Sequence, residues 1–586
     1  MGFEEFALFY RQTLNFTEQD FFNLLSILEK PLPSSLRITD TPFKHLIEKR
    51  LSKMRKSQFF TNVYEAPRHR IPNKKFIINQ TKAGHIQRQE VVSMLPVLLM
   101  GMEPSFSVLD MCAAPGSKTK QLLEIINDKG LVVCNEVKFK RMRILVSETC
   151  KIPRRGFMVL RHDASTLPVF KKDFDRVLCD VPCSGDGTTR KNYGVVPNWC
   201  INNALSLCEL QFSILKNAIN FVKDDGLIVY STCSLNPIEN ECIIQKAVLE
   251  LDLEIVDLRN NINEKFLSKK FKFREGLTKW NINIKNYNGI NFEPVNDNIG
   301  LSKCIRVLPH DQNTGGFFIT GLKKKIKSLS VLDGKNLSVL GGKNVSESIN
   351  IYLSEINNYI TENTNYITEN TNNLLENTNN LLKNDMEAIK NNINSIENDI
   401  INVAGNNIKI NEIDIQFNEL EECISDLKFN KIDTIKNKKA RGFSIISDEL
   451  REALSKEYNI KDKILVQKKE GSMFIYEVSQ EVLEIMNNKN LTIDFYGYKL
   501  FEKNNLNESG YMLKAVPKES SPDFEISQKQ LADILYNGEL QYEYKKGSII
   551  VLLKDFNIMV SGHSNGDHIT LNINYKLQRA LKDYIK

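Results

Sequence analysis

The stretch VLDMCAAPGSKTKQLLE at residues 108–124 decides the fold class of this chain. It predicts a short apolar strand that ends at Asp110, a tight loop, and a helix that begins near Ser117. Such a turn brings backbone N–H groups and a helix N-terminus close to a bound ligand. It is not a P-loop, because Gly116 is followed by serine and no glycine stands five residues earlier. It also lacks the GxGxxG pattern of dinucleotide sites.

Further apolar runs on either side of this stretch complete the pattern. They lie at residues 106–112, 131–136, 157–163, 174–180 and 226–233, and helical stretches separate most of them. This alternation predicts a mainly parallel sheet with helices on both faces, a doubly wound α/β fold. Ligands of such folds lie beyond the carboxyl ends of the strands. The side chains predicted at those ends are Asp110, Glu136, Asp163, Asp180 and Cys233.

The acidic residues among them suggest a nucleoside ligand. Glu136 lies 26 residues after Asp110, where an acid can hold a ribose diol by analogy with dinucleotide folds. Asp163 could contact an adenine. Taken singly, any of these acids could instead cap a helix.

Two cysteines stand in turns directly after apolar strands. Cys183 follows Pro182 in FDRVLCDVPCSGDGTTRKN (174–192), and Cys233 follows Thr232 in GLIVYSTCSLNPIENE (226–241). A lone cysteine near a strand is usually a small buried apolar residue. Two of them at neighbouring strand ends, with Asp180 three residues before the first, favour chemistry instead.

Length and charge indicate several parts and a polyanionic partner. The 586 residues are too many for a single core. Residues 1–330 carry a net charge of +14 and the remainder −8. Residues 44–88 hold twelve Lys and Arg, interleaved with Phe59, Phe60 and Tyr64. That mixture suits single-stranded nucleic acid, although a solvated basic surface gives the same pattern.

The cysteine pattern and the N-terminus bear on the compartment. The eleven cysteines are odd in number and form no CxxC pair, so neither a disulfide framework nor a zinc ribbon fits. The residues MGFEEFALFY resemble no signal peptide, and no apolar run reaches the length of a membrane span. We therefore expect an intracellular, soluble protein that is not secreted, not membrane-bound and holds no metal.

The flanking regions differ from this central part. Residues 1–40 read as helical up to Pro31, and residues 326–435 are rich in Asn, Thr, Ser and Glu. Four seven-residue repeats at 358–385 could form a coiled coil, but each offers only two adjacent apolar residues, so we favour a mobile linker. Alternating strand patterns resume from about 440 to 586.

The quoted motifs also carry a resemblance to a known family. DMCAAPGSKT, DVPCSGDGTTRKN and YSTCSLNPIENE resemble the signatures of the Sun-domain RNA cytosine-5 methyltransferases. Residues 1–322 resemble the tRNA-modifying branch, with AGHIQRQEVVSMLPVLL (83–99) similar to its lead-in helix and RVLPHDQNTGGFFI (306–319) to its closing strands. The tail resembles a PUA-like RNA-binding domain only faintly.

This resemblance implies a Rossmann-like class I methyltransferase domain that uses S-adenosyl-L-methionine. It implies that Cys233 attacks C6 of cytosine, that Cys183 assists release, and that Asp180 protonates N3. Glu136 would bind the ribose, although Asp is commoner there, and Asp163 the adenine edge. The remaining cofactor contacts would be Cys112, Ala113, Ala114, Pro115, Gly116, Ser117 and Lys118, with Asp180 beside them.

We therefore predict a helical, basic RNA-contacting module (1–100), a methyltransferase domain (101–325), a linker (326–439) and a PUA-like domain (440–586). The predicted function is cytosine-5 methylation of tRNA, by a monomer. The alternatives are the same chemistry on ribosomal or messenger RNA, or a non-catalytic RNA-binding protein with this fold. The family and basic clusters such as KKKIK (323–327) suggest the nucleus or nucleolus, and otherwise the cytoplasm.

Overall fold

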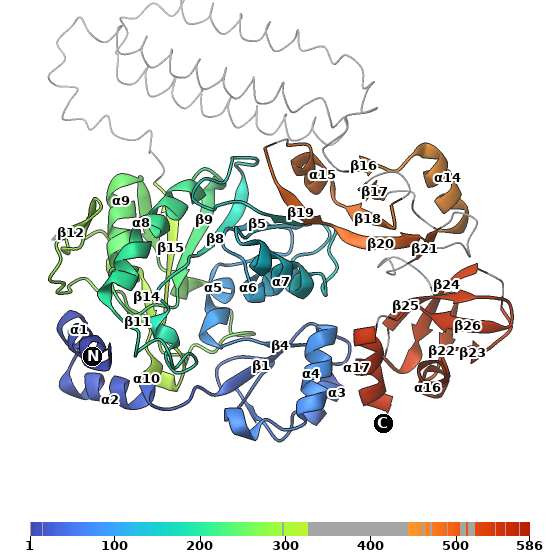
Figure 1. Ribbon diagram of the computed structural model, residues 1–586, viewed down its shortest axis with the longest axis horizontal. Coiled ribbons are helices and arrows are strands. Elements are labelled where there is room, and N and C mark those ends of the chain that lie inside the picture. The colour runs from blue at the N-terminus through green and yellow to red at the C-terminus, as the bar shows by residue number, and fades with distance from the viewer. Residues whose placement is uncertain are drawn as a thin grey trace, which may run out of the picture. The chain divides into compact units, whose positions relative to one another are not determined.

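The computed structural model describes residues 2–325 except 15, 296 and 297, and residues 443–585 except 459, 461–462, 469–471, 489, 504–510, 514–521, 545–546, 557 and 574. These residues belong to one compact unit (Figure 1). The predicted linker at 326–439, with its repeats, lies outside the described residues. None of the helices that the structure describes combines the length and apolarity needed to cross a bilayer.

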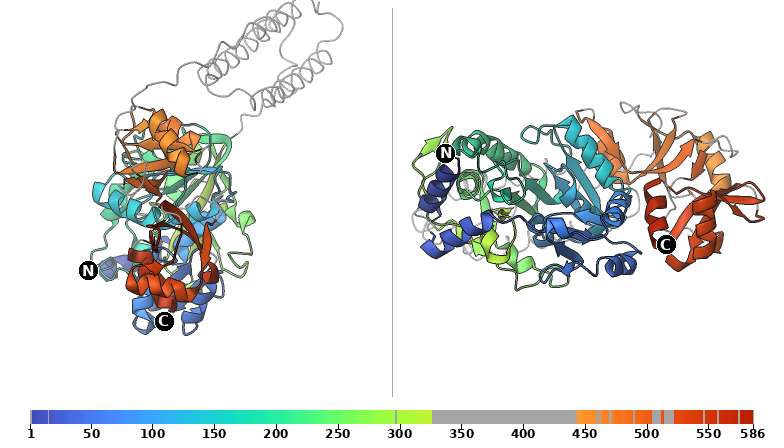
Figure 2. Two further views of the ribbon diagram at one scale, coloured as in Figure 1. Left: turned by 90° about the vertical axis from the view of Figure 1, so that its right-hand side faces the viewer. Right: turned by 60° about the horizontal axis from the view of Figure 1, so that its bottom comes forward.

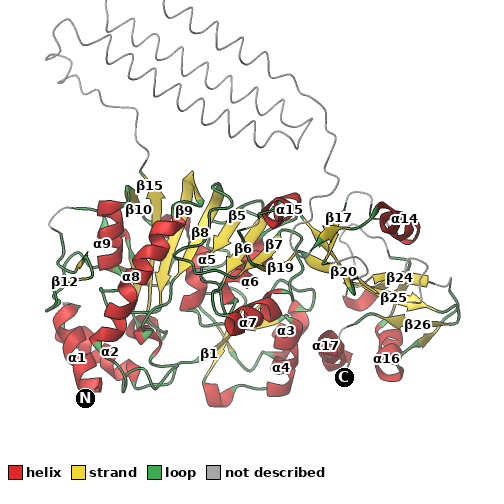
Figure 3. Cartoon of the chain, turned by 45° about the horizontal axis from the view of Figure 1, so that its top comes forward, coloured by secondary structure: helices red, strands yellow, loops and turns green. Residues whose placement is uncertain are grey.

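A ten-stranded mixed sheet forms the centre of the fold, in the order β11-β14-β15-β9-β8-β5-β6-β7-β19, with β10 beside β15 (Figure 3). Strands β5 to β9 pair in parallel with one another, and β15 pairs antiparallel with β9. The strand order reverses between β5 and β8, which is where ligands bind in such sheets. The strands are β5 (Ser107–Asp110), β6 (Leu131–Asn135), β7 (Phe157–Leu160), β8 (Phe174–Asp180), β9 (Val222–Thr232), β10 (Leu253–Val256), β11 (Arg274–Glu275), β14 (Ile305–Val307), β15 (Phe317–Lys324) and β19 (Ile493–Tyr496).

Helices cover both faces of this sheet (Figures 1 and 2). Alternate residues of each strand enter different cores: Leu109 packs with α8 (Ile201–Ala218) and α9 (Glu241–Glu250), whereas Val108 packs with α5 (Leu95–Leu99), α6 (Ser117–Ile125) and α7 (Phe139–Thr149). Strands buried on both faces read as continuous apolar runs. The doubly wound central fold and its five predicted parallel strands are therefore confirmed.

The N-terminal helices are also confirmed. Helix α1 (Gly2–Thr13) is followed by α2 (Glu18–Leu28), which Thr17 caps by accepting a hydrogen bond from Asp20 N at 3.1 Å. Their apolar residues form a separate core with Trp199 and Leu235 of the central part. The hairpin is thereby anchored beside the loops that follow β8 and β9.

The prediction of a helical module is wrong for part of residues 34–88, where four short strands form a sheet in the order β2-β3-β1-β4 beside two helices. Its strands are very short, so only two or three alternating residues signal each one, too few to compete with the basic residues between them. The predicted lead-in helix at 83–99 likewise begins as a strand and is α-helical only in α5. The elements are β1 (Ser34–Ile38), α3 (Lys44–Arg50), β2 (Arg55–Lys56), β3 (Val63–Ala66), α4 (Lys74–Ala83) and β4 (Ile86–Arg88).

The C-terminal part contains two five-stranded sheets, in the orders β16-β17-β18-β20-β21 and β22-β24-β25-β26-β23, while β19 pairs antiparallel with β7 of the central sheet. The strands predicted for the tail are confirmed, and helices lie between them. Its elements are β16 (Ser444–Ile445), α14 (Asp448–Glu457), β17 (Ile464–Gln467), β18 (Phe474–Val478), α15 (Gln480–Met486), β20 (Tyr498–Lys503), β21 (Tyr511–Leu513), β22 (Phe524–Ile526), α16 (Gln528–Asn537), β23 (Leu540–Gln541), β24 (Gly547–Leu553), β25 (Ile558–Ser564), β26 (His568–Leu571) and α17 (Tyr575–Ile585).

One glycine tests the close packing of the parallel strands. A Cβ at Gly156, just before β7, would lie 2.0 Å from the carbonyl oxygen of Gly130, just before β6. Gly156→Ala must displace backbone, so we expect it to destabilise the protein by about 1–3 kcal/mol in urea denaturation. Gly194→Ala is the control, because the nearest atom would be 3.9 Å away. Equal stability of the two variants would contradict this account of the packing.

Candidate active site

The loop after β5 has the form that the sequence predicted. Helix α6 begins at Ser117, and its N-cap Gly116 has a φ of +102°. A Cβ at Gly116 would lie 2.9 Å from Leu145 Cδ1 of α7, so the loop lies directly against that helix. Arg141 of α7 donates a hydrogen bond to the carbonyl oxygen of Ala114 at 2.6 Å. Leu145 and Arg141 of α7 thus hold the loop from Cys112 to Lys118 in place.

Two buried carboxyl groups flank this loop. Asp110 accepts a hydrogen bond from Thr119 Oγ1 at 2.8 Å, but its other oxygen is buried without a partner in the described part of the chain. Burial raises the pKa of Asp110 to about 7, against the opposing hydrogen bond from Thr119. Glu136 follows β6 and is buried, and it accepts from Lys138 N at 2.9 Å. Both acids stand where the sequence placed them.

Asp163 differs from these two acids. It lies three residues beyond the end of β7 and is exposed. Its carboxylate accepts hydrogen bonds from Ser165 N at 2.9 Å and Ser165 Oγ at 2.7 Å. In this structure Asp163 therefore caps its own turn, which is the alternative that the sequence left open.

Asp180 and Lys118 form an ion pair between the two predicted regions of the site. Lys118 Nζ lies 2.7 Å from Asp180 Oδ2 and also donates to Ser93 Oγ at 3.2 Å. Ser231 Oγ of β9 donates to Asp180 Oδ1 at 2.8 Å. Lys118 was expected in the cofactor loop, with Asp180 as a further cofactor contact. Its pairing with the acid of the cysteine region was not predicted, because the two residues are 62 positions apart.

The two predicted cysteines are in contact. Cys183 Sγ lies 3.3 Å from Cys233 Sγ, although 50 residues separate them in the chain. The hydrogen bond with Cys233 and burial both raise the pKa of Cys183 well above its ordinary value. Cys183 therefore keeps its proton at neutral pH and can donate a hydrogen bond to the sulfur of Cys233.

A buried carboxyl group that the sequence analysis missed fixes the loop of Cys183. Glu239 accepts from Ser184 N at 2.8 Å, from Ser184 Oγ at 2.5 Å and from Gln211 Nε2 at 2.9 Å. Gln211 also donates to the carbonyl oxygen of Pro182 at 2.8 Å. Glu239 thereby holds the residues on both sides of Cys183.

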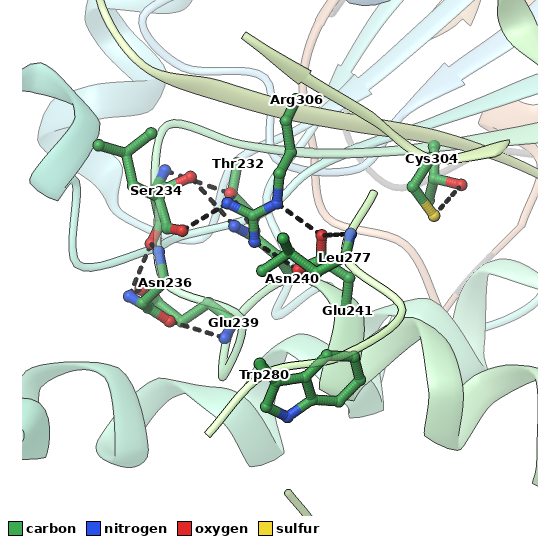
Figure 4. A network of polar contacts seen from close by, with 12 residues as sticks. Thr232, Ser234, Asn236, Glu239, Asn240, Glu241, Leu277, Trp280, Cys304 and Arg306 are labelled. Atoms are coloured by element: carbon green, nitrogen blue, oxygen red, sulfur yellow. Dashed lines mark hydrogen bonds and ion pairs between the residues drawn. The ribbon is translucent and has the colours of Figure 1, made fainter. Parts of the chain in front are cut away.

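Arg306 of β14 supports the turn of Cys233 from behind (Figure 4). Its Nε donates to Glu241 Oε1 at 2.6 Å and its Nη2 to Glu241 Oε2 at 2.5 Å. Its Nη1 donates to the carbonyl oxygen of Leu235 at 2.6 Å. Asn240 completes the turn by bonding Thr232 Oγ1 at 2.6 Å and the carbonyl of Ser234 at 3.1 Å. The turn of Cys233 therefore rests on a buried network in which Arg306 and Glu241 are paired.

The N-terminal helices reach this network. The Tyr10 hydroxyl donates to Asp186 Oδ2, and Leu235 N donates to Asp186 Oδ1 at 2.6 Å. Asp186 thus joins α1, the loop of Cys183 and the turn of Cys233. Asp186 and Glu239 both lie in the motifs quoted above, but their roles as buried acceptors depend on partners far away in the sequence.

Comparisons with known proteins identify the family of this chain. Residues 97–323 match the family model described as 16S rRNA methyltransferase RsmB/F. A tRNA (cytosine(49)-C(5))-methyltransferase of Pyrococcus abyssi is 30% identical over 244 residues, which are 41% of this chain and 71% of that protein. The chain belongs to the RsmB/F family of RNA methyltransferases.

Two eukaryotic relatives of this family are more similar over their shared parts. The tRNA (cytosine(34)-C(5))-methyltransferase of Drosophila melanogaster is 38% identical over 44% of this chain and 39% of its own length. The multisite-specific tRNA:(cytosine-C(5))-methyltransferase of Saccharomyces cerevisiae is 33% identical over 55% of each chain. The match thus spans between two-fifths and just over half of the length of these two relatives.

The cofactor of the RsmB/F family is S-adenosyl-L-methionine, and the residues at the β5 and β6 ends fit it. Among the described residues, one carboxyl oxygen of Asp110 is buried without a partner, and such an oxygen calls for a hydrogen-bond donor. Glu136 is a second buried acid with acceptor capacity to spare for a ribose. We expect the loop from Cys112 to Lys118 to hold the rest of the molecule.

The raised pKa of Asp110 predicts a pH effect on stability. The folded protein keeps this proton up to about pH 7, whereas the ordinary pKa is 3.8. The contribution of Asp110 to the free energy of unfolding therefore falls as the pH rises between these values. Asp110→Asn should remove that fall in urea denaturation of the cofactor-free protein. With exposed Asp163→Asn as control, parallel pH curves for Asp110→Asn and the wild type would contradict the assignment.

Proposed function

We propose that this protein transfers a methyl group from S-adenosyl-L-methionine to C5 of cytosine in tRNA, through a covalent bond between Cys233 and C6. The observation that carries the proposal is the 3.3 Å contact between Cys183 and Cys233 beside Asp180. An enzyme that used one cysteine only, as nucleophile, would not need a second cysteine in contact with it. tRNA is favoured as substrate because the three relatives described above are named as tRNA methyltransferases.

The first step makes C5 nucleophilic. The Cys233 thiolate adds to C6, and the displaced π electrons move through C5 and C4 to N3, which takes up a proton. Asp180 relays this proton from the ammonium of Lys118, which lies 2.7 Å from its carboxylate. The product is an enamine at C5 bonded to Cys233. S-adenosyl-L-methionine supplies the electrophilic methyl group that C5 then accepts.

The second step releases the product. A base takes the C5 proton, and the electron pair of that C–H bond forms the C5–C6 double bond again. The bond between C6 and Cys233 breaks with its electrons on the sulfur, and N3 returns its proton to the pair of Asp180 and Lys118. Cys183, which holds its proton beside the departing sulfur, stabilises the thiolate by a hydrogen bond. The two cysteines therefore have separate tasks, attack by Cys233 and release by Cys183. The target base must leave any helix to reach them.

The flanking parts extend the proposal. We assign RNA contacts to residues 1–100 and 443–585, with a PUA-like fold for part of the latter, and the catalytic step to 101–325. Nuclear location and a monomeric state remain predictions of the sequence. The same chemistry on ribosomal RNA is the alternative, because the matching family model is named for 16S rRNA.

Transfer of radiolabelled methyl from S-adenosyl-L-methionine to a bulk tRNA pool tests the reaction and substrate. We expect label in 5-methylcytidine after nucleoside analysis, and none with Cys233→Ala, since that variant lacks the nucleophile. Cys150→Ala, an exposed cysteine outside the site, is the matched control. Label in ribosomal RNA instead of tRNA would show that ribosomal RNA is the substrate. No label in either, despite RNA binding, would favour the non-catalytic alternative.

Loss of Cys183 should separate attack from release. In Cys183→Ala the departing sulfur has no hydrogen-bond donor, so we expect a covalent protein–RNA complex that survives denaturing electrophoresis. The double variant Cys183→Ala/Cys233→Ala should show no such complex. Normal turnover by Cys183→Ala would show that the assigned role is wrong.

A further inference from the structure

A pocket of about 310 Å³ lies beside the active site, between the N-terminal sheet and the segment before β15. Its lining includes Phe59, Gln58 and Arg55 on one side and Asn313 and Glu90 on the other. It is separate from the cysteine pair, because neither Cys183 nor Cys233 lines it. None of the roles assigned above uses it.

Arg190 joins this pocket to the loop of Cys183. The side chain is fully buried and comes from the same motif, DVPCSGDGTTRKN. It donates to the carbonyl oxygens of Lys30 at 2.9 Å and Thr314 at 2.8 Å, and to Asn313 Oδ1 at 2.6 Å. One buried guanidinium therefore ties the wall formed by Asn313 and Thr314 to the loop of Cys183.

Glu90 forms the end of the pocket that is nearest the chemistry. A Cβ at Gly315 would lie 1.8 Å from Glu90 Oε1, so the carboxyl group rests on that backbone. The carbonyl oxygen of Glu90 accepts from Ser93 N at 3.1 Å, and Ser93 Oγ accepts from Lys118, the partner of Asp180. Burial raises the pKa of Glu90, which favours a protonated acid that can both donate and accept.

The aromatic residues Phe59, Phe60 and Tyr64 of the basic stretch differ in how far their side chains are exposed. Phe60 and Tyr64 are buried, at 3% and 6% exposure, and belong to the interior. Phe59 is half-buried and lines the pocket, where its ring is supported edge-on by Phe271 at 5.4 Å between centroids. Phe60 also lines the pocket but is only 3% exposed, so of these three aromatics Phe59 offers the most accessible ring to a base.

We propose that this pocket holds an unstacked nucleobase of the substrate RNA, one next to the target cytosine along the strand. The proposal rests on the proposed function, since it takes RNA as the substrate. An aromatic face, an exposed amide at Gln58, an arginine and an acid together match the faces and edges of a base. The pocket would give the enzyme a preference for the flanking nucleotide and help to keep the cytosine out of its helix.

Steady-state methylation of a bulk tRNA pool tests the role of Phe59. We expect Phe59→Ala to raise KM for tRNA about tenfold and to change kcat less than twofold, because a lost base stack weakens binding alone. Phe59→Tyr keeps a ring and should restore KM. Tyr287→Ala removes a ring that is 37% exposed, outside the site and outside the parts to which RNA contacts are assigned, and should leave both constants unchanged. An unchanged KM in Phe59→Ala would overturn the proposal.

A second measurement does not need turnover. The full-length wild-type protein is irradiated with tRNA transcripts that carry 4-thiouridine or 6-thioguanosine, and crosslinked peptides are identified by mass spectrometry. Crosslinks within residues 55–60 or 310–315 support the pocket. Crosslinks found only elsewhere overturn it, even if Phe59→Ala is unstable. Absence of methylation by the wild type would instead overturn the proposed function, so the two failures are distinguishable.

Discussion

The parallel pairing of β8 with β9 is the constraint on which the rest of the site depends. Its register sets Asp180 opposite Ser231, and their side chains are hydrogen bonded at 2.8 Å. Cys183 follows the first residue by three positions and Cys233 the second by two, so both turns begin from the same edge of the sheet. A slip of one residue would send every side chain of one strand to the opposite face, and the two sulfur atoms would no longer meet.

Buried polar groups hold the two turns, in addition to the packing of Leu235 in the core of the N-terminal helices. Glu239 fixes the loop of Cys183, Arg306 with Glu241 fixes the turn of Cys233, and Asp186 joins both to Tyr10 of α1. Such groups are costly to bury unless each finds a partner, and here each has one. This network restricts movement of both cysteine turns, so that the two sulfur atoms stay in contact. It also makes the N-terminal helices part of the catalytic architecture.

The same reasoning connects chemistry with RNA recognition. The backbone of Lys118 lies in the first turn of α6, and its side chain pairs with Asp180. The proposed cofactor and cytosine sites therefore share one ion pair. Arg190 belongs to the motif of Cys183, and its guanidinium donates a hydrogen bond to Thr314 in the wall of the neighbouring pocket. Residues of one motif thus act at two places, and a substitution at either cation would disturb both. This sharing explains why the N-terminal sheet, itself without catalytic groups, must pack closely on the methyltransferase part.

The sequence alone determined the five parallel strands, the glycine loop before α6, and the positions of Cys183, Cys233, Asp180 and Glu136, because each depends on local hydrophobic pattern and turn residues. It also carried the family resemblance. Only the tertiary structure decided that Lys118 pairs with Asp180, that Asp163 caps its own turn, and that Phe59 is accessible where Phe60 and Tyr64 are not. The short strands of residues 34–88 were missed for the same reason. Their partners lie far along the chain, and contacts between distant residues are settled by packing rather than by periodicity.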